Sequence, residues 1–169
     1  MAFNKYWGKH CRAIHIPSKT ATVSDLQTEV ELLRQRENFI PDVIIIDYAD
    51  LIKPDSHDAK RHQLDDIWEE LRAWGQTDSA LIITASQTNR LSADAQYMKA
   101  THVAEDWSKA AKVDIAIGLC QSDTMKEYGM MNINKVLHRH EEFVESHVCT
   151  ILQELSTQQA ELDSEFSVM

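Results

Sequence analysis

Residues 41–48 read Pro-Asp-Val-Ile-Ile-Ile-Asp-Tyr, and this stretch decides the class of fold. Its centre, Val43 to Ile46, is a continuous run of β-branched residues without polar alternation. Such a run is typical of a parallel strand that is buried on both faces, because helices then cover both sides of the sheet. The stretch therefore predicts a buried strand that ends in a carboxylate, Asp47.

Other apolar runs predict five more strands. Leu81–Ala85 and Ile115–Leu119 have the same unbroken pattern, and Arg12–Ile16 is a weaker candidate. No helix separates the last two, Met131–Leu137 and Val148–Leu152, so we expect them to form an antiparallel hairpin at the sheet edge.

Three amphipathic stretches lie between these runs. The first helix is predicted to begin at Ser24, with Gln27 completing a capping box. The second covers about Arg61 to Gln76 and the third Val103–Ala111, each with an apolar stripe at spacings of three and four residues. Strands that alternate with helices imply a mainly parallel sheet with helices on its faces. The predicted fold class is α/β.

Length and composition limit the organisation of the chain. It has 169 residues and a mass of 19.4 kDa, with 43% hydrophobic and 26% charged residues, as in a soluble globular protein. No apolar run approaches the ~20 residues that span a bilayer, and residues 1–12 lack the apolar core of a secretory signal. We expect one domain over residues 1–155, a disordered acidic tail over 156–169 and a cytoplasmic location, with no membrane partner.

The charge balance limits the partners. With 17 basic and 27 acidic residues the net charge is −10, which repels a polyanion unless cations gather on one face or loop. This disfavours a protein that coats nucleic acid, but not a motor that touches DNA through one loop or an enzyme that handles a nucleotide with magnesium. Cys11, Cys120 and Cys149 suit no disulfide framework and are expected to be buried thiols.

Polar side chains follow two of the predicted strands. Asp47 follows Val43–Ile46, and Gln87 follows Leu81–Ala85. Because the carboxyl ends of parallel strands meet at one edge of a sheet, the two side chains can share a ligand. A carboxylate on a rigid strand can orient the Mg²⁺ that bridges nucleotide phosphates, as a Walker B element does. Taken singly, an aspartate at a strand end is as readily explained as a cap of the next turn.

Taken in order, the motifs resemble the motor domain of DnaB-type replicative helicases, the superfamily 4 RecA-like ATPases. The likeness rests on residues 41–48, Leu81–Arg90, Val103–Ile117 and Asn134–His140, and it runs from roughly Thr22 to Leu155. It implies a RecA-like sheet flanked by helices and the cofactors ATP and Mg²⁺. It also implies a role in DNA replication, with single-stranded DNA and the homologous subunits of a ring, such as a hexamer, as partners.

The resemblance assigns roles to particular side chains. Asp47 matches the Walker B carboxylate, which acts on magnesium through water. Gln87 matches the polar sensor of the γ-phosphate, a role that suits an amide because it binds phosphate without adding charge. The simpler alternative is that Gln87 caps the loop of residues 88–92.

Two further roles involve cations. Arg139 matches the arginine finger that is offered to the nucleotide of the adjacent subunit, where a permanently charged, forked guanidinium is suitable. The family usually has a lysine two residues earlier, whereas this chain has Leu137 there and Lys135 displaced. In the loop Leu91–Thr101 and beside it, Arg90 and Lys99 are the cations available to meet DNA phosphates.

The chain departs from the family in one large respect. The pattern G-x-x-x-x-G-K-[ST] does not occur, and the four glycines, at positions 8, 75, 118 and 129, cannot form a phosphate-binding loop. In the resembling helicases the P-loop strand and the catalytic glutamate precede the segment matched by Arg12. The expectation is therefore the carboxyl-terminal part of a RecA-like motor, split, truncated or degenerate, which needs a polypeptide carrying the P-loop half.

Two classes of function stay open. The chain is either part of an ATP-dependent helicase motor, inactive by itself, or a non-catalytic RecA-like module that docks on a helicase or recombinase ring. Other polar groups have simpler explanations. The eight histidines lack the spacing of a zinc site, and the acidic residues of the second helix are more simply a solvated face than a catalytic dyad. These are Asp65, Asp66, Glu69 and Glu70.

Overall fold

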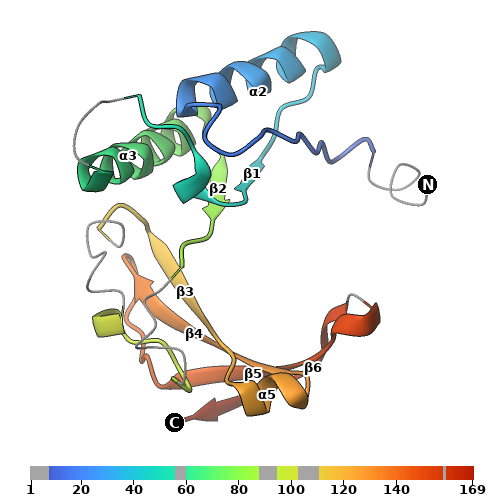
Figure 1. Ribbon diagram of the computed structural model, residues 1–169, viewed down its shortest axis with the longest axis vertical. Helices are drawn as coiled ribbons and strands as arrows, with labels where there is room; N and C mark the ends of the chain where they lie inside the picture. Colours follow the sequence, from blue (N-terminus) through green and yellow to red (C-terminus); the bar gives the residue numbers. More distant parts are fainter. Residues whose placement is uncertain (1–7, 56–59, 88–94, 103–110, 158) are drawn as a thin grey trace. The chain divides into compact units, whose positions relative to one another are not determined.

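A computed structural model describes residues 8–55, 60–87, 95–102, 111–157 and 159–169. The chain divides into two compact units, Met1–Ala85 and Ser86–Met169. In the described residues of the first unit, two helices pack with a two-stranded sheet, and the second unit is built on a four-stranded sheet (Figure 1). The predicted α/β class is confirmed.

The sheet of the first unit consists of two parallel strands, β1 (Val43–Ile46) and β2 (Leu81–Thr84), as predicted. In both strands exposed and half-buried residues alternate, because successive side chains point to opposite faces. The expected burial on both faces is therefore wrong. The side chains of one face are between 45% and 73% exposed, namely Val43, Ile45, Leu81 and Ile83.

Helix α2 (Val23–Glu37) begins one residue before the predicted start, and its capping box is not the predicted one. The cap is Thr22, whose hydroxyl accepts a hydrogen bond from the Asp25 N–H at 3.2 Å, while the Asp25 carboxylate accepts one from the Thr22 N–H at 2.9 Å. The predicted box of Ser24 and Gln27 is wrong because another pair at the same spacing, with a carboxylate as acceptor, lies two residues earlier.

Helix α3 (Lys60–Asp78) confirms the second predicted helix. Its apolar stripe forms most of the core of the first unit, with Ile67, Trp68, Leu71 and Trp74 buried. The third predicted helix lies outside the described residues except at its end, Ala111. The predicted strand Arg12–Ile16 is wrong, because the structure has no regular element there.

The second unit is an antiparallel sheet in the order β3-β4-β5-β6. The pairing of β4 with β5 confirms the predicted hairpin, although β5 is not at the edge. β3 was expected beside the parallel strands, whereas in the described residues it pairs with β4 only. The strands are β3 (Ile115–Cys120), β4 (Met130–His138), β5 (His147–Glu154) and β6 (Gln159–Val168). The short elements are α5 (Asp123–Glu127), η1 (Ala49–Leu51), η3 (Ala100–His102) and η5 (Leu155–Thr157).

Strand β6 lies where the sequence predicts a disordered tail. Its low apolar content suggested disorder, yet acidic residues alternate with less polar ones along it, for example Glu161, Leu162 and Asp163. This alternation fits an antiparallel strand that stays largely in water, and most residues of β6 are indeed exposed. Pairing with β5 therefore orders a segment that composition alone marks as unfolded.

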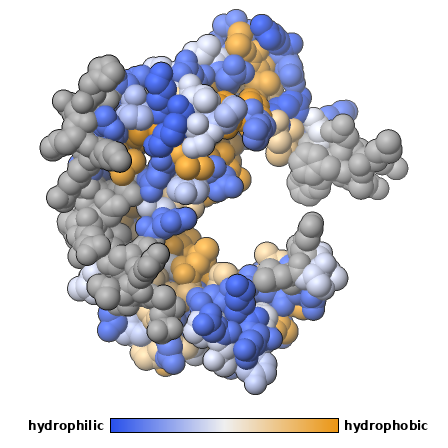
Figure 2. Space-filling view, in the orientation of Figure 1, coloured by the Kyte–Doolittle hydropathy of each residue, from blue (hydrophilic) through white to orange (hydrophobic). Residues whose placement is uncertain are grey.

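Apolar side chains remain exposed on both units, as the orange areas of Figure 2 show. On β3 the exposed fractions of Ile115, Ile117 and Leu119 are 51%, 62% and 62%. Within the described residues, no helix is long and apolar enough to cross a bilayer.

Candidate functional site

Asp47 stands at the carboxyl end of β1, with an exposed side chain. A hydroxyl of the neighbouring strand holds the turn around it. Thr84, the last residue of β2, donates a hydrogen bond to the Ile46 carbonyl at 3.0 Å and accepts one from the Ala49 N–H at 2.8 Å. These bonds fix the backbone on both sides of Asp47, whose peptide bond to Tyr48 is cis. The carboxylate therefore projects from a restrained turn.

The segment after this turn is held from its other side by the loop before α2. The ammonium group of Lys19 donates to the carbonyls of Asp50 at 2.5 Å and Ile52 at 2.9 Å. Backbone bonds join Lys19 N–H to Leu51 O and Lys53 N–H to Ala21 O, both at 2.8 Å. The η1 turn is thus bonded on two sides, which adds to the rigidity of the Asp47 site.

Gln87 lies three residues beyond β2, and its side chain is exposed. Since Ile46 pairs with Thr84, β1 and β2 end at the same level, as the prediction of a shared edge requires. Gln87 belongs to the second unit, however, and Asp47 to the first. A ligand common to both side chains stays a prediction.

Arg139 follows β4 and is engaged within its own unit. Its Nε lies 3.2 Å from Asp114 Oδ1, and its Nη2 donates to the carbonyls of Ala111 at 2.7 Å and Val113 at 3.3 Å. The Asp114 ion pair is about half exposed, and pairs of this kind contribute only ~0–1 kcal/mol. To serve as an arginine finger, Arg139 would have to exchange these partners for phosphate.

Lys135, the displaced lysine, lies near a different carboxylate. Its Nζ is 3.9 Å from Glu141 Oε2, and His138 Nε2 is 3.7 Å from the same oxygen. His140 Nε2 is 4.0 Å from Asp114 Oδ1. In the part of the chain that is described, no three histidine, cysteine or acidic side chains gather as metal ligands.

Of the two cations predicted to meet DNA, Arg90 lies outside the described residues. Lys99 is exposed, and its Nζ lies 5.2 Å from the centroid of the Tyr97 ring, within the range of a cation–π contact. Tyr97 was not among the predicted residues, although an aromatic residue two positions before a lysine in a nucleic-acid loop is a usable signal.

Two buried asparagines of β4, Asn132 and Asn134, were also missed. They are 3% and 4% exposed, and their amide groups bind the backbone of the segment that carries Tyr97 and Lys99. The available signal was the pair of polar residues at alternate positions in an otherwise apolar strand, since buried amides need hydrogen-bond partners.

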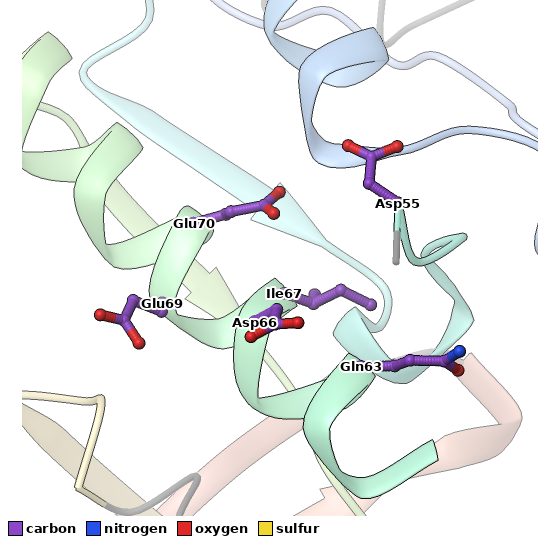
Figure 3. A pocket seen from close by; sticks show the side chains of 6 residues that line it. All are labelled: Asp55, Gln63, Asp66, Ile67, Glu69 and Glu70. Atoms are coloured by element: carbon purple, nitrogen blue, oxygen red, sulfur yellow. The ribbon is translucent and has the colours of Figure 1, made fainter. Parts of the chain in front are cut away.

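The acidic residues of α3 line a hollow of about 340 Å³ (Figure 3). Asp66 and Glu69 are exposed, as the solvated-face interpretation predicts. Glu70 is half-buried, and its pKa is raised by burial and by the neighbouring charges of Asp55 and Asp66. This excess of negative charge makes the hollow unsuitable for a nucleotide phosphate.

The predicted buried thiols are found at one position. Cys120 is buried, which raises the pKa of its thiol. Cys149 is half-buried, and Cys11 is exposed, so burial was wrongly predicted for Cys11.

The sequence matches no protein-family model and no curated protein. Its fold, however, is the RecA-like α/β fold of replicative-helicase ATPase domains, as the resemblance implies. One similar solved structure is an ATPase domain of this kind. It has 15% sequence identity and a TM-score of 0.68 over 88% of this chain and 52% of that chain.

A second similar structure is that of a DnaB-like replicative helicase and its interactions with primase. Its identity is also 15% and its TM-score 0.67, over 83% of this chain and 34% of that chain. The chain thus spans about half the length of the first neighbour and about a third of the second.

Proposed function

We propose that residues 1–155 form part of an ATP-dependent replicative DNA helicase motor. The helicase-type fold and the restrained turn that bears Asp47 carry this proposal. Asp47 holds Mg²⁺ through water, and Gln87 senses the γ-phosphate. Arg139 reaches the nucleotide of an adjacent subunit in a ring, and Arg90 and Lys99 contact single-stranded DNA.

The exposed Asp47 carboxylate suits a hydrated magnesium ion, because such an ion keeps several waters and takes few protein ligands. When bound, MgATP supplies the phosphoryl group whose transfer to water drives a motor. The chain's own contribution is to orient magnesium-bound water at Asp47 and to donate an amide hydrogen bond at Gln87. Most of the phosphate binding must come from a P-loop, which this sequence lacks.

We propose that a polypeptide segment carrying the P-loop half packs on the first unit. It would cover the exposed face of Val43, Ile45, Leu81 and Ile83, since contiguous apolar surface favours association. Among the described residues β2 pairs only with β1, so its other edge can accept a strand. The neighbours' greater length supports such a missing half. A cytoplasmic location is part of this proposal.

The test is ATP hydrolysis by the chain combined with a P-loop half. Asp47→Asn should abolish saturable hydrolysis, because an amide holds hydrated magnesium poorly. Asp42→Asn is the matched control: it makes the same charge change at the opposite end of β1, and activity should persist. Equal loss in both variants would contradict the role of Asp47.

A second candidate function is a non-catalytic module that docks on a helicase or recombinase ring. The intrachain partners of Arg139 favour it, because they occupy the proposed finger. Sedimentation and hydrogen exchange on the chain alone distinguish the two. A monomer with protected amides in β1, β2 and β3 would favour the module, whereas an associated chain rescued by a P-loop half would favour the motor.

A further inference from the structure

The segment Gln96–Ala100 is bound to one face of the second sheet by side chains instead of by a neighbouring strand. Asn132 Nδ2 donates to the Gln96 carbonyl at 2.8 Å, and Thr150 donates to Asn132 Oδ1 at 2.7 Å. Asn134 binds the segment two residues further on. Asparagines two positions apart on β4 therefore hold backbone groups two positions apart on the segment.

Asn134 makes the more complete contact. Its Oδ1 accepts the Met98 N–H at 2.9 Å, and its Nδ2 donates to the Met98 carbonyl at 2.8 Å. The same Nδ2 lies 3.1 Å from the Glu145 carbonyl, and the Glu145 carboxylate accepts the Ala100 N–H at 2.8 Å. One amide thus satisfies both polar groups of a residue that is 4% exposed. Such groups are costly to leave unpaired.

A glycine permits this close approach. A Cβ placed on Gly118 of β3 would lie 2.4 Å from Met98 Cβ and 2.9 Å from Asn134 Oδ1, so no larger residue fits without moving the segment. Met98 packs against Cys120 and Val136, which are also buried. The position of Met98 is thus determined by packing and by hydrogen bonds together.

The residues on either side of Met98 are more accessible. Tyr97 is half-buried and Lys99 exposed, and they are near each other, as the cation–π distance shows. An aromatic ring beside a cation is the combination that binds single-stranded nucleic acid, through base stacking and phosphate contact. In a chain with net charge −10, where that cation stands matters, because it must act against the overall field.

We propose that Asn132 and Asn134 are positioning residues that present Tyr97 and Lys99 to a single-stranded nucleic acid. This inference rests on the proposed DNA contact of Lys99 and adds Tyr97 as a base-stacking group. The asparagines do not touch the nucleic acid. They act by holding the backbone between the two contact residues.

The test is the salt dependence of oligothymidylate binding to the full chain, measured by fluorescence anisotropy below the onset of self-association. Loss of one phosphate contact lowers the slope of log K against log salt by about 0.7 for single strands. We expect Lys99→Ala and Asn134→Ala each to lower it by about this amount, and the double variant to lower it no further. Ile151→Ala is the matched control. It removes a buried side chain of the same sheet that touches none of these groups, and the slope should stay unchanged.

Hydrogen exchange supplies the second measurement. In Asn134→Ala the Met98 amide should lose its protection while the β4–β5 ladder keeps its own. Additive effects of Lys99→Ala and Asn134→Ala, or a Met98 amide that stays protected, would overturn the positioning role while leaving the DNA contact intact. An unchanged slope in Lys99→Ala would instead refute the proposed DNA contact, and the presentation of Lys99 with it.

Discussion

The hydroxyl of Thr84 supports the Asp47 turn, and its removal has a calculable cost. Thr84→Val keeps the shape of the side chain but removes one donor and one acceptor. The Ala49 N–H then loses its partner in a fully buried residue, at a cost of roughly 1–3 kcal/mol, and the bond to the Ile46 carbonyl adds about 0.5–1.5 kcal/mol. We therefore expect the free energy of unfolding of the first unit to fall by roughly 2–4 kcal/mol.

Denaturant unfolding followed by the fluorescence of Trp68 and Trp74 measures this change, since both side chains are buried in the same unit. Thr77→Val is the matched control. It removes a hydroxyl that bonds the Ala73 carbonyl on an exposed helix face, and should change stability by less than about 0.5 kcal/mol. The reasoning would be refuted if Thr84→Val cost no more than this control, or if the Ala49 amide exchanged no faster with solvent.

Three further predictions concern the chain as a whole. The isolated chain should show negligible ATP hydrolysis, because it has no P-loop; a saturable activity that Asp47→Asn abolishes would contradict this. Glu70→Gln should stabilise the protein at pH 7. The raised pKa of Glu70 means that its protonated form is favoured on folding, so stability is greatest below the ordinary pKa of 4.5 and falls as pH rises. Thermal unfolding of both proteins at pH 4 and 7 checks whether the gain is confined to the higher pH. Finally, the exposed β1–β2 face should drive self-association, and the double substitution Ile45→Thr with Ile83→Thr should reduce it in sedimentation experiments.

The apolar runs predicted the strands well, because continuous β-branched sequence has few other uses. Val43–Ile46 and Leu81–Thr84 are parallel neighbours as expected, and the stripe of α3 is the core of its unit. Burial on both faces could not be predicted from the runs alone. It depends on what covers the sheet, and Ile45, at 73% exposed, shows that the described residues do not cover that face.

The site was only partly accessible to sequence reasoning. Asp47 could be found because it ends a strand, and the structure adds that Thr84 restrains its turn. Asn134 could not be assigned a partner, because its bonds join residues 36 positions apart in sequence. Arg139 illustrates the opposite case: the resemblance assigned it to a neighbouring nucleotide, whereas the structure shows bonds to its own chain.

The charges of strand β6 give the second sheet a protected side. Within the described residues β6 is the last strand, and Glu161, Asp163 and Glu165 along it would repel the same charges on another copy. β2 and β3 carry no charged side chain and have no such defence. Further strands are therefore recruited selectively, at uncharged edges and not at β6, which favours a closed complex with a chosen partner over open-ended fibres.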